Sequence, residues 1–299
     1  MLFWCIYQSI PVIIMSDSTA LDRPRNSIQE FIKKRIVKLC SAGLVAGTPQ
    51  FEYLHSLGIQ RANIFLVYDV VDNLYFSTGA DFAQQNGIIV RENIHLPEHY
   101  FLSSCRFIRE KNLPNLLIAY ADYKKQSGEK AWPLVLLGDG PLKADVVKLR
   151  DELNIGNHLL LPGFKQYHEL PLFYGLAKVF ILSSISEPWG LVVNEAMASG
   201  LPVLVSNYCG CAADLVEEGK NGFTFDPYDV NALTQLMLRV ASDDCDLDIM
   251  GAASREIISH WTPETFADNL LKATDAALKA LRPKITLLDK ALLWALIRR

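Results

Sequence analysis

Short apolar runs recur along the chain, and each is followed by a polar or amphipathic stretch. The runs are four to six residues long and rich in Val, Ile and Leu, which is typical of buried β-strands. They lie at residues 12–15, 43–47, 63–68, 100–104, 133–138, 158–163, 179–184 and 202–206. Because most of these runs are almost continuously apolar, we expect parallel sheets that are covered on both faces.

The stretches between the runs have the spacing of helices. In residues 27–40, apolar side chains recur three and four positions apart, as at Ile28, Phe31 and Ile32. The same spacing occurs in residues 113–126, 141–155, 170–177 and 230–243. Strands that alternate with helices predict an α/β fold with a doubly wound parallel sheet.

The length of 299 residues suggests about two domains. Residues 78–100 are polar and contain two glycines, so we place the boundary there. We predict a partial N-terminal Rossmann-like domain at 1–86, a linker at 87–99, a main domain at 100–262 and C-terminal helices at 263–299. The first of these holds three strands, which is few for an independent doubly wound domain.

The two ends of the chain are apolar. Residues 1–18 lack a basic start and a cleavage site for a signal peptide, and Gln8, Ser9 and Pro11 interrupt them. We therefore expect a helix end, a buried strand and a loop; an uncleaved signal segment is the other reading. The stretch from Leu287 to Ile297 predicts a helix that packs onto the domain or lies at a membrane surface.

Composition narrows the class of protein. Hydrophobic residues make up 50% and charged residues 21%, which excludes general disorder. The net charge of -4 offers no basic excess for nucleic acid. Six cysteines without C-x-x-C spacing favour neither a disulfide framework nor a zinc site, and they fit a reducing compartment. We expect a cytoplasmic protein; a peripheral contact with the inner face of the membrane is compatible with this location.

The segment SEPWGLVVNEAMASGLPVLVSNYCG, residues 186–210, holds Glu187 and Glu195 in an otherwise apolar context. An ionised carboxylate is expensive to bury without partners, so the pair either faces water or awaits a ligand. The segment follows the strand at 179–184, and a helix is predicted from Gly190. In open α/β sheets ligands bind outside the carboxyl ends of strands, where helix N-termini attract phosphate.

This placement predicts a ligand with a diphosphate and a ribose. The diphosphate would lie at the amides of Gly190, Leu191 and Val192. A carboxylate more than a turn into the helix repels phosphate, but it can accept hydrogen bonds from neighbouring ribose hydroxyls, which suits Glu195. The alternative is a loop acid at Glu187 and a solvent-facing acid at Glu195.

With seven residues between Glu187 and Glu195, the same segment resembles the E-x7-E signature of the retaining glycosyltransferases of family 4, the group 1 glycosyl transferases, which have the GT-B fold. Flanking segments match in the right order, at 104–120, 134–184 and 208–229. The resemblance is close over about residues 100–229. It implies a GT-B-like fold, with a nucleotide-sugar-binding domain at 100–262 and an acceptor-side domain at 1–86.

The resemblance also implies a role for each candidate site residue. Arg106 and Lys111 would neutralise the diphosphate of the donor in place of a metal, and no D-x-D motif is present. Glu187 would contact the donor sugar and its phosphate together with the amides of Trp189, Gly190 and Leu191, and Val192 lies in the same turn. Glu195 would bind the ribose. The base would be lined by Gly163, Phe164 and Lys165.

The expected activity is transfer of a hexosyl group from a nucleoside-diphosphate sugar, with retention of configuration and without a metal or organic cofactor. The acceptor would be a saccharide, a lipid-linked compound or a small molecule, as in polysaccharide biosynthesis. The N-terminal part resembles only the end of the family's first domain. The alternative is therefore a truncated or split donor-binding module that needs a partner chain; a weaker one is a sugar-nucleotide epimerase or hydrolase.

Three details depart from the motif set or remain outside it. Cys105 stands where the family often has glycine, and Trp189 where phenylalanine is common. The turn from Gly138 to Gly140 reads as a strand-to-helix connection that needs small residues, rather than as a ligand contact. A charged loop either contacts the acceptor or is solvated; its residues are Asp17, Asp22, Arg23 and Arg25.

Overall fold

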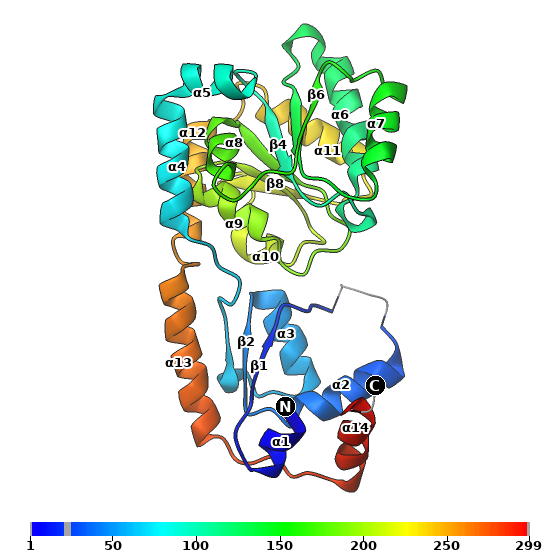
Figure 1. Ribbon diagram of the computed structural model, residues 1–299, viewed down its shortest axis with the longest axis vertical. Helices are drawn as coiled ribbons and strands as arrows, with labels where there is room; N and C mark the ends of the chain where they lie inside the picture. The colour runs from blue at the N-terminus through cyan, green and yellow to red at the C-terminus, as the bar shows by residue number, and fades with distance from the viewer. Residues whose placement is uncertain (1, 21–24, 298–299) are drawn as a thin grey trace. The chain divides into compact units, whose positions relative to one another are not determined.

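A computed structural model describes residues 2–20 and 25–297 (Figure 1). The chain forms two compact units: unit 1 comprises residues 1–70 and 261–299, and unit 2 comprises residues 71–260. Each unit is an α/β layer structure built on a parallel sheet, which confirms the predicted fold class.

The sheet of unit 1 has three described strands in the order β1-β2-β3: β1 (Ile13–Ser16), β2 (Ala42–Val45) and β3 (Ile64–Phe65). All pairs are parallel, with Ile13 opposite Ala42 and Gly43 opposite Ile64. The central strand is fully buried. At the edge, β1 is only half-buried and exposes Met15, so the prediction of a strand is confirmed but its complete burial is wrong.

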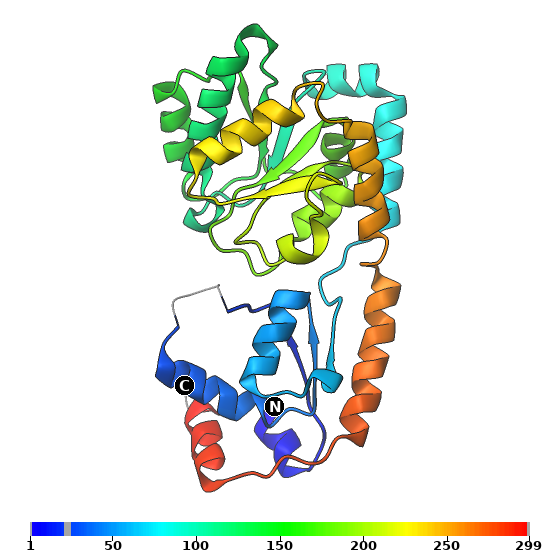
Figure 2. The ribbon, with the colours of Figure 1, turned by 180° about the vertical axis from the view of Figure 1, so that it is seen from behind.

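Helices cover both faces of this sheet. On one side lie α2 (Ser27–Val37) and α3 (Thr48–Leu57), and α13 (Pro263–Lys279) packs on the other (Figures 1 and 2). The last helix, α14 (Leu287–Ile297), contacts α2, where Arg35 and Asp289 form an ion pair at 2.8 Å. The predicted C-terminal helices therefore exist and belong to unit 1. Unit 1 also contains α1 (Leu2–Tyr7) and a short 3-10 turn, η1 (Arg61–Asn63).

The sheet of unit 2 has six described strands, all parallel, in the order β6-β5-β4-β7-β8-β9. They are β4 (Phe101–Ser104), β5 (Leu134–Leu137), β6 (Leu159–Gly163), β7 (Val179–Leu182), β8 (Val203–Ser206) and β9 (Gly222–Phe225). The first five coincide with predicted strands, whereas β9 was not predicted. Its sequence, Gly-Phe-Thr-Phe, reads as a turn followed by a short polar-apolar alternation.

Unit 2 is doubly wound, because its helices fall into two layers (Figures 1 and 2). One layer contains α6 (Leu113–Ser127), α7 (Lys143–Glu152) and α11 (Val230–Val240). The other contains α4 (Asn73–Gln85), α8 (Leu170–Leu176), α9 (Leu191–Ala198) and α12 (Leu247–Ile258). Shorter elements are α5 (Gly87–Ile94), α10 (Ala212–Leu215), η2 (Arg109–Lys111) and η3 (Gly128–Lys130).

The division between the units differs from the predicted boundary. The residues predicted as a linker, 87–99, lie inside unit 2, and the polar segment around them is largely helical. One of its glycines, Gly79, has a packing role in α4. A Cβ there would lie 2.5 Å from the Cβ of Pro171, so glycine allows α4 and α8 to approach closely.

The strand order of unit 2 creates one distinctive position. Connections leave β4 toward β5 on one side, and the chain later returns to β7 on the other side of β4. At such a switch point the two connecting loops diverge and open a crevice outside the carboxyl ends of the strands. The loops that diverge here follow Ser104 and Leu182, and they carry Lys111 and Glu187.

Candidate functional site

The loop after β4 and the loop after β7 are tied to each other at the switch point. The hydroxyl of Ser183 donates a hydrogen bond to the carbonyl of Lys111 at 3.0 Å, and the amide of Ile185 donates to the carbonyl of Glu110 at 2.8 Å. Asn112 follows in a left-handed conformation and starts α6, and its amide group donates to the carbonyl of Pro227 at 2.8 Å. These bonds hold the backbone around Lys111 in a fixed position.

Lys111 and Glu187 form an ion pair across these two loops. The exposed fractions of their side chains are 16% and 15%, so both charges are largely removed from water. Ser184 is fully buried, and its hydroxyl donates to the same carboxylate oxygen of Glu187 at 3.4 Å. Glu187 is therefore neither a solvated loop acid nor an unpaired buried charge.

Arg106, the other predicted basic residue, lies in the same loop but is exposed. Its side chain forms no ion pair with any residue in the described ranges. The structure thus brings Lys111 to Glu187 and leaves the guanidinium of Arg106 in solvent.

The start of α9 lies next to the ion pair. Gly190 precedes the helix with φ 111°, a conformation that favours glycine, and a Cβ there would lie 3.4 Å from the Cγ of Glu187. The amide of Val193 donates to the carbonyl of Gly190 at 2.8 Å, whereas the amides of Leu191 and Val192 before it have no carbonyl one turn back in the helix and mark its positive end. Leu191 is exposed and Val192 is partly exposed. An anion could therefore reach this turn.

Trp189 is placed differently from its neighbours. Its ring is 2% exposed, and the indole nitrogen donates to Asn194 at 3.0 Å. The side chain is part of the core, so only the backbone of Trp189 remains available to a ligand.

Glu195 lies on the second turn of α9, where it is mostly enclosed. The hydroxyl of Tyr174, from α8, donates a hydrogen bond to its Oε2 at 2.7 Å. Burial raises the pKa of Glu195 to about 7, and the hydrogen bond from Tyr174 opposes that shift. The carboxyl group is therefore poised between its neutral and ionised forms near neutral pH.

Of the three residues predicted to line a base, Gly163 ends β6, and Phe164 and Lys165 follow it; β6 lies two strand positions away from β4. Gly163 has φ 82°, and no atom lies within 4 Å of where its Cβ would be. Phe164 is exposed. Lys165 lies over the ring of Phe173 at 5.2 Å and pairs with Glu169 at 3.5 Å. The space beside Gly163 is open, and within the described residues none of the three forms a hydrogen bond with Glu187 or Glu195.

The glycine turn after β5 has a structural explanation. Gly138 has φ 126°, and a Cβ there would lie 1.9 Å from the carbonyl oxygen of Cys105. Glycine is required at this position so that β5 and the loop after β4 can approach, which confirms that this connection needs a small residue.

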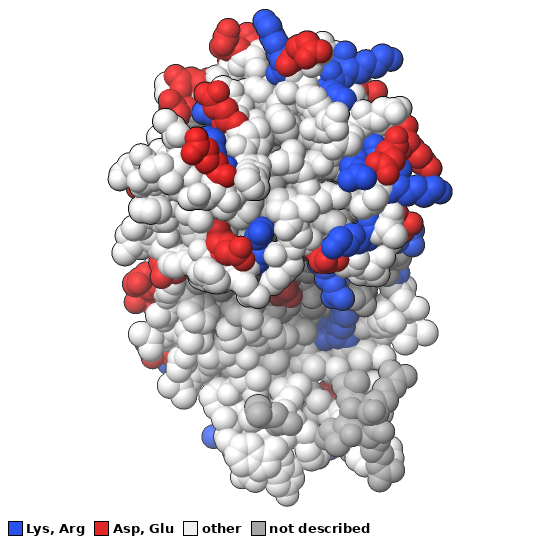
Figure 3. Space-filling view, turned by 45° about the horizontal axis from the view of Figure 1, so that its top comes forward, with Lys and Arg blue, Asp and Glu red and all other residues white. Residues whose placement is uncertain are grey.

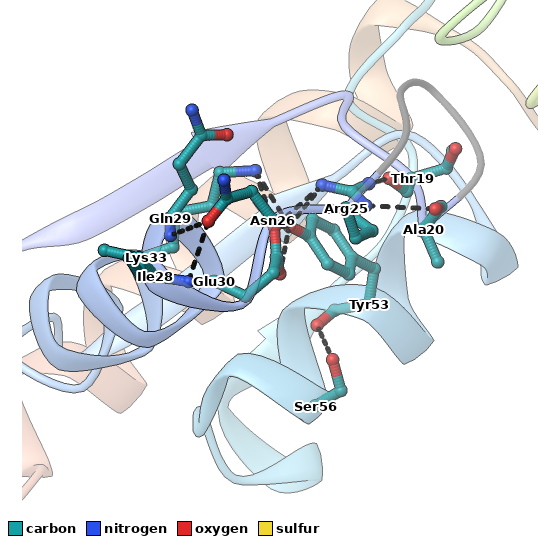
Figure 4. Close-up of polar contacts among 10 residues, drawn as sticks. All are labelled: Thr19, Ala20, Arg25, Asn26, Ile28, Gln29, Glu30, Lys33, Tyr53 and Ser56. Carbon is teal, nitrogen blue, oxygen red and sulfur yellow. Dashed lines mark hydrogen bonds and ion pairs between the residues drawn. The ribbon is translucent and has the colours of Figure 1, made fainter.

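Of the charged loop in unit 1, Asp22 and Arg23 lie outside the described residues, and Asp17 is exposed. The guanidinium of Arg25 donates to the carbonyl of Thr19, to the hydroxyl of Tyr53 at 2.7 Å and to Glu30 at 3.1 Å (Figure 4). Arg25 is therefore paired within unit 1, rather than simply solvated.

Two residues of the site were missed by sequence reasoning. Tyr174 holds Glu195, and Ser184 contacts Glu187. The signal for Tyr174 was present: a tyrosine on the buried side of an apolar helix needs a partner for its hydroxyl. The partner itself, 21 residues away in the chain, could not be read from spacing.

Charge on the surface is mixed. On the face in Figure 3, the basic and acidic side chains of the upper part alternate rather than form a field of one sign. This fits the small net charge of the chain and differs from the basic stripe of a nucleic-acid-binding surface.

Comparison with known proteins gives a family match for most of unit 2. Residues 85–257 match the family model described as "Glycosyl transferases group 1". The chain is 38% identical over 126 residues to the sulfoquinovosyl transferase SQD2 of Arabidopsis thaliana, covering 41% of this chain and 24% of that protein. It is 29% identical over 183 residues to a GDP-mannose-dependent alpha-(1-6)-phosphatidylinositol monomannoside mannosyltransferase of Mycobacterium tuberculosis (strain ATCC 25618 / H37Rv), covering 58% and 47%.

The matched part of the chain thus spans a quarter to about a half of the length of these relatives. Among solved structures, Anabaena Alr3699/HepE in complex with UDP superposes with a TM-score of 0.79 at 17% identity, covering 92% of this chain and 75% of that one. At this identity the likeness concerns the fold, and it agrees with the predicted GT-B-like architecture.

Proposed function

Because the chain belongs to the glycosyl transferases of group 1, we propose that it transfers a sugar from a nucleoside-diphosphate sugar to an acceptor. One observation carries the proposal. The ion pair of Lys111 and Glu187 lies at the switch point of unit 2, beside the free amides at Gly190. These groups lie within the matched residues 85–257.

In this proposal the basic groups serve the leaving diphosphate. Negative charge grows on the nucleoside diphosphate as its bond to the sugar breaks, and fixed donors at that position lower the barrier. Lys111 would act together with the α9 amides, since it contacts Glu187, and the Cγ of Glu187 lies 3.4 Å from where a Cβ of Gly190 would be. Arg106 is exposed in the same loop and would close onto the outer phosphate.

The carboxylates would bind hydroxyls. Glu187 would release Lys111 to the diphosphate and accept hydrogen bonds from the donor sugar. Glu195 would accept from the ribose. The base would lie over the open space at Gly163, between Phe164 and Lys165.

The finer assignment is also a proposal. The E-x7-E segment supports family 4 and retention of anomeric configuration. The basic pair Lys111 and Arg106 supports chemistry without a metal or an organic cofactor. The named relatives transfer sulfoquinovosyl and mannosyl groups, and the HepE structure contains UDP. We therefore propose a hexosyl donor, and a lipid-linked, saccharide or small-molecule acceptor as in polysaccharide biosynthesis.

Calorimetric titration of the whole chain with UDP, GDP and ADP tests the proposal. We expect one nucleotide to bind saturably. Glu195→Ala should weaken it by roughly tenfold or more, the size of a lost hydrogen bond to a charged group. Lys111→Met should weaken binding of the nucleoside diphosphate but leave binding of the corresponding nucleoside unchanged, because only the diphosphate group interacts with the charge of Lys111. Glu152→Ala, an exposed carboxylate of α7, is the matched control.

The outcomes separate this function from its rivals. Equal binding of wild type and both variants would remove the donor site from unit 2. Binding followed by donor turnover without any acceptor would favour a hydrolase or epimerase. A product whose anomeric configuration, measured by NMR, is opposite to that of the donor would contradict retention but leave the rest of the proposal intact.

We also propose a cytoplasmic location with peripheral membrane contact through unit 1. Among the described residues no helix is both long and apolar enough to cross a membrane. Large apolar side chains are exposed on α14 at Leu287 and Trp294 and on α2 at Ile28 and Phe31, and α2 also carries several basic residues. Flotation with anionic and neutral vesicles tests this contact, and absence from both vesicle fractions would contradict it.

A further inference from the structure

The carboxyl group of Glu195 is anchored through one oxygen only. Tyr174, completely enclosed in α8, donates to Oε2 at 2.7 Å. The other oxygen, Oε1, has no hydrogen-bond partner among the described residues. A carboxylate with one oxygen held and one open is suited to receive an external donor group.

The phenol that anchors Glu195 is fixed in orientation. Its ring packs edge-on against Phe76 of α4, with centroids 5.9 Å apart, and at a tilt of 46° against Phe180 of β7, with centroids 5.7 Å apart. Phe76 is in turn packed edge-on by Tyr167 at 5.4 Å. The ring of Tyr174 therefore cannot turn its hydroxyl away from α9 without disturbing its contacts with Phe76 and Phe180.

Other buried tyrosines of unit 2 show that a phenol does not need a carboxylate as its partner. The hydroxyl of Tyr100 donates to the carbonyl of Phe173 at 2.6 Å, and that of Tyr120 donates to the carbonyl of Trp132 at 3.0 Å. A backbone carbonyl satisfies the hydroxyl without burying an ionisable group. The need of the Tyr174 hydroxyl for a hydrogen-bond acceptor therefore does not explain why that acceptor is the carboxylate of Glu195.

The remaining charged groups near α9 are occupied elsewhere. Arg255 of α12 pairs with Asp81 of α4 at 2.6 Å, and it donates to the carbonyl of Ser199 at 3.3 Å. Tyr167 is the other titratable group that interacts with Glu195. No described cation pairs with Glu195, so its ionisation depends on burial and on the phenol.

We propose that Tyr174 is a positioning residue for the donor nucleotide: its hydroxyl holds the Glu195 carboxylate so that the open oxygen receives the ribose hydroxyls. The proposal rests on the proposed function, in which Glu195 binds ribose. It adds that nucleotide binding is coupled to the ionisation of Glu195, and that Tyr174 sets this coupling.

The direction of the pH effect follows from the contacts. The ionised carboxylate offers acceptors to the ribose, and protonation removes one of them. Affinity should therefore fall as the pH drops below the pKa of Glu195, which is about 7 in the free chain. Because the phenol stabilises the ionised form, Tyr174→Phe should raise that pKa and move the transition in affinity to higher pH.

The experiment is calorimetric titration of the whole chain between about pH 6 and pH 9, a window that brackets this ionisation. The probes are UDP, GDP and ADP, and then the 2′-deoxy form of the one that binds. Tyr174→Phe should weaken the ribonucleotide by roughly tenfold near pH 7, with partial recovery at high pH. It should also narrow the preference for the ribonucleotide over the deoxy form. Tyr120→Phe, which loses a buried hydroxyl outside the site, should change neither.

Unchanged affinity, midpoint and ribose preference in a folded Tyr174→Phe chain would overturn the positioning role. The Glu195→Gln variant keeps this result apart from the proposed function. If Glu195→Gln binds the nucleotide as the wild type does, the ribose role of Glu195 fails. If Glu195→Gln weakens binding while Tyr174→Phe does not, only the role of Tyr174 fails.

A second measurement needs no tyrosine variant, in case Tyr174→Phe does not fold. The wild-type affinity should follow one ionisation near pH 7, and Glu195→Gln should lack this dependence. A wild-type affinity that is flat over the same pH range would overturn the coupling. Near-ultraviolet circular dichroism confirms the fold of each variant.

Discussion

At the scale of single residues, the two carboxylates of the candidate site are stabilised by different partners. Glu187 has a cation, Lys111, and a serine hydroxyl. Glu195 has only a phenol, and its ionised form is held in a mostly apolar place. Removing a carboxylate from water without a cation lowers the free energy of unfolding, so the ionised form of Glu195 is expected to weaken the fold.

The stability of the chain should reveal this through its pH dependence. The pKa of Glu195 is about 7 in the folded chain, against 4.5 for an ordinary glutamate, so the folded chain holds this proton more tightly. As the pH rises from about 4.5 to 7, the unfolded chain ionises first and folding loses free energy. The free energy of unfolding falls by at most about 3 kcal/mol, and this fall is complete above pH 7.

Glu195→Gln does not titrate, so its stability relative to wild type should increase from about pH 5 to pH 7 and then stay level. Urea unfolding over this pH range measures the difference. Glu169→Gln is a useful contrast, because a backbone hydrogen bond from Gln166 lowers the pKa of Glu169 below its ordinary value of 4.5, so its difference from wild type should stay level between pH 5 and pH 7. A constant difference for Glu195→Gln would contradict the explanation.

At the scale of elements, the strands were predictable because parallel strands buried on both faces are continuously apolar. Leu134–Leu137 and Val179–Leu182 are fully buried, and their continuously apolar sequences predict them as strands. The errors occurred where small or polar residues serve packing. Gly79 reads as a break but allows α4 to contact α8, and the short strand Gly222–Phe225 begins with a glycine directly after the polar residues 217–221, so it reads as part of a turn.

The glycine turn after β5 makes this point testable. Gly138→Ala would place a Cβ 1.9 Å from the carbonyl of Cys105 in a left-handed conformation. We expect a loss of about 2 kcal/mol or more in the free energy of unfolding. Gly156→Ala is the control, since its Cβ would meet nothing nearer than Arg150 at 4.0 Å. Equal thermal melting of the two variants would show that the connection has room for a side chain.

At the scale of the whole molecule, each unit has its own core. One cluster of buried apolar residues lies entirely within residues 101–250, and another within residues 37–64. The C-terminal helices could be predicted from the sequence, but not that α13 packs on the sheet of unit 1. That contact joins residues some 200 positions apart, which local periodicity does not encode.

Separate cores lead to a prediction about residues 71–260. Because the core, the Lys111–Glu187 pair and Glu195 all lie within unit 2, we expect this fragment to fold alone and to bind the nucleoside diphosphate as the whole chain does. Calorimetry on the fragment and on the whole chain measures the two dissociation constants, and agreement within about threefold, or about 0.6 kcal/mol, is expected. The fragment with Glu195→Ala controls for specific binding. A folded fragment that binds much more weakly would show that residues of unit 1 take part in holding the donor.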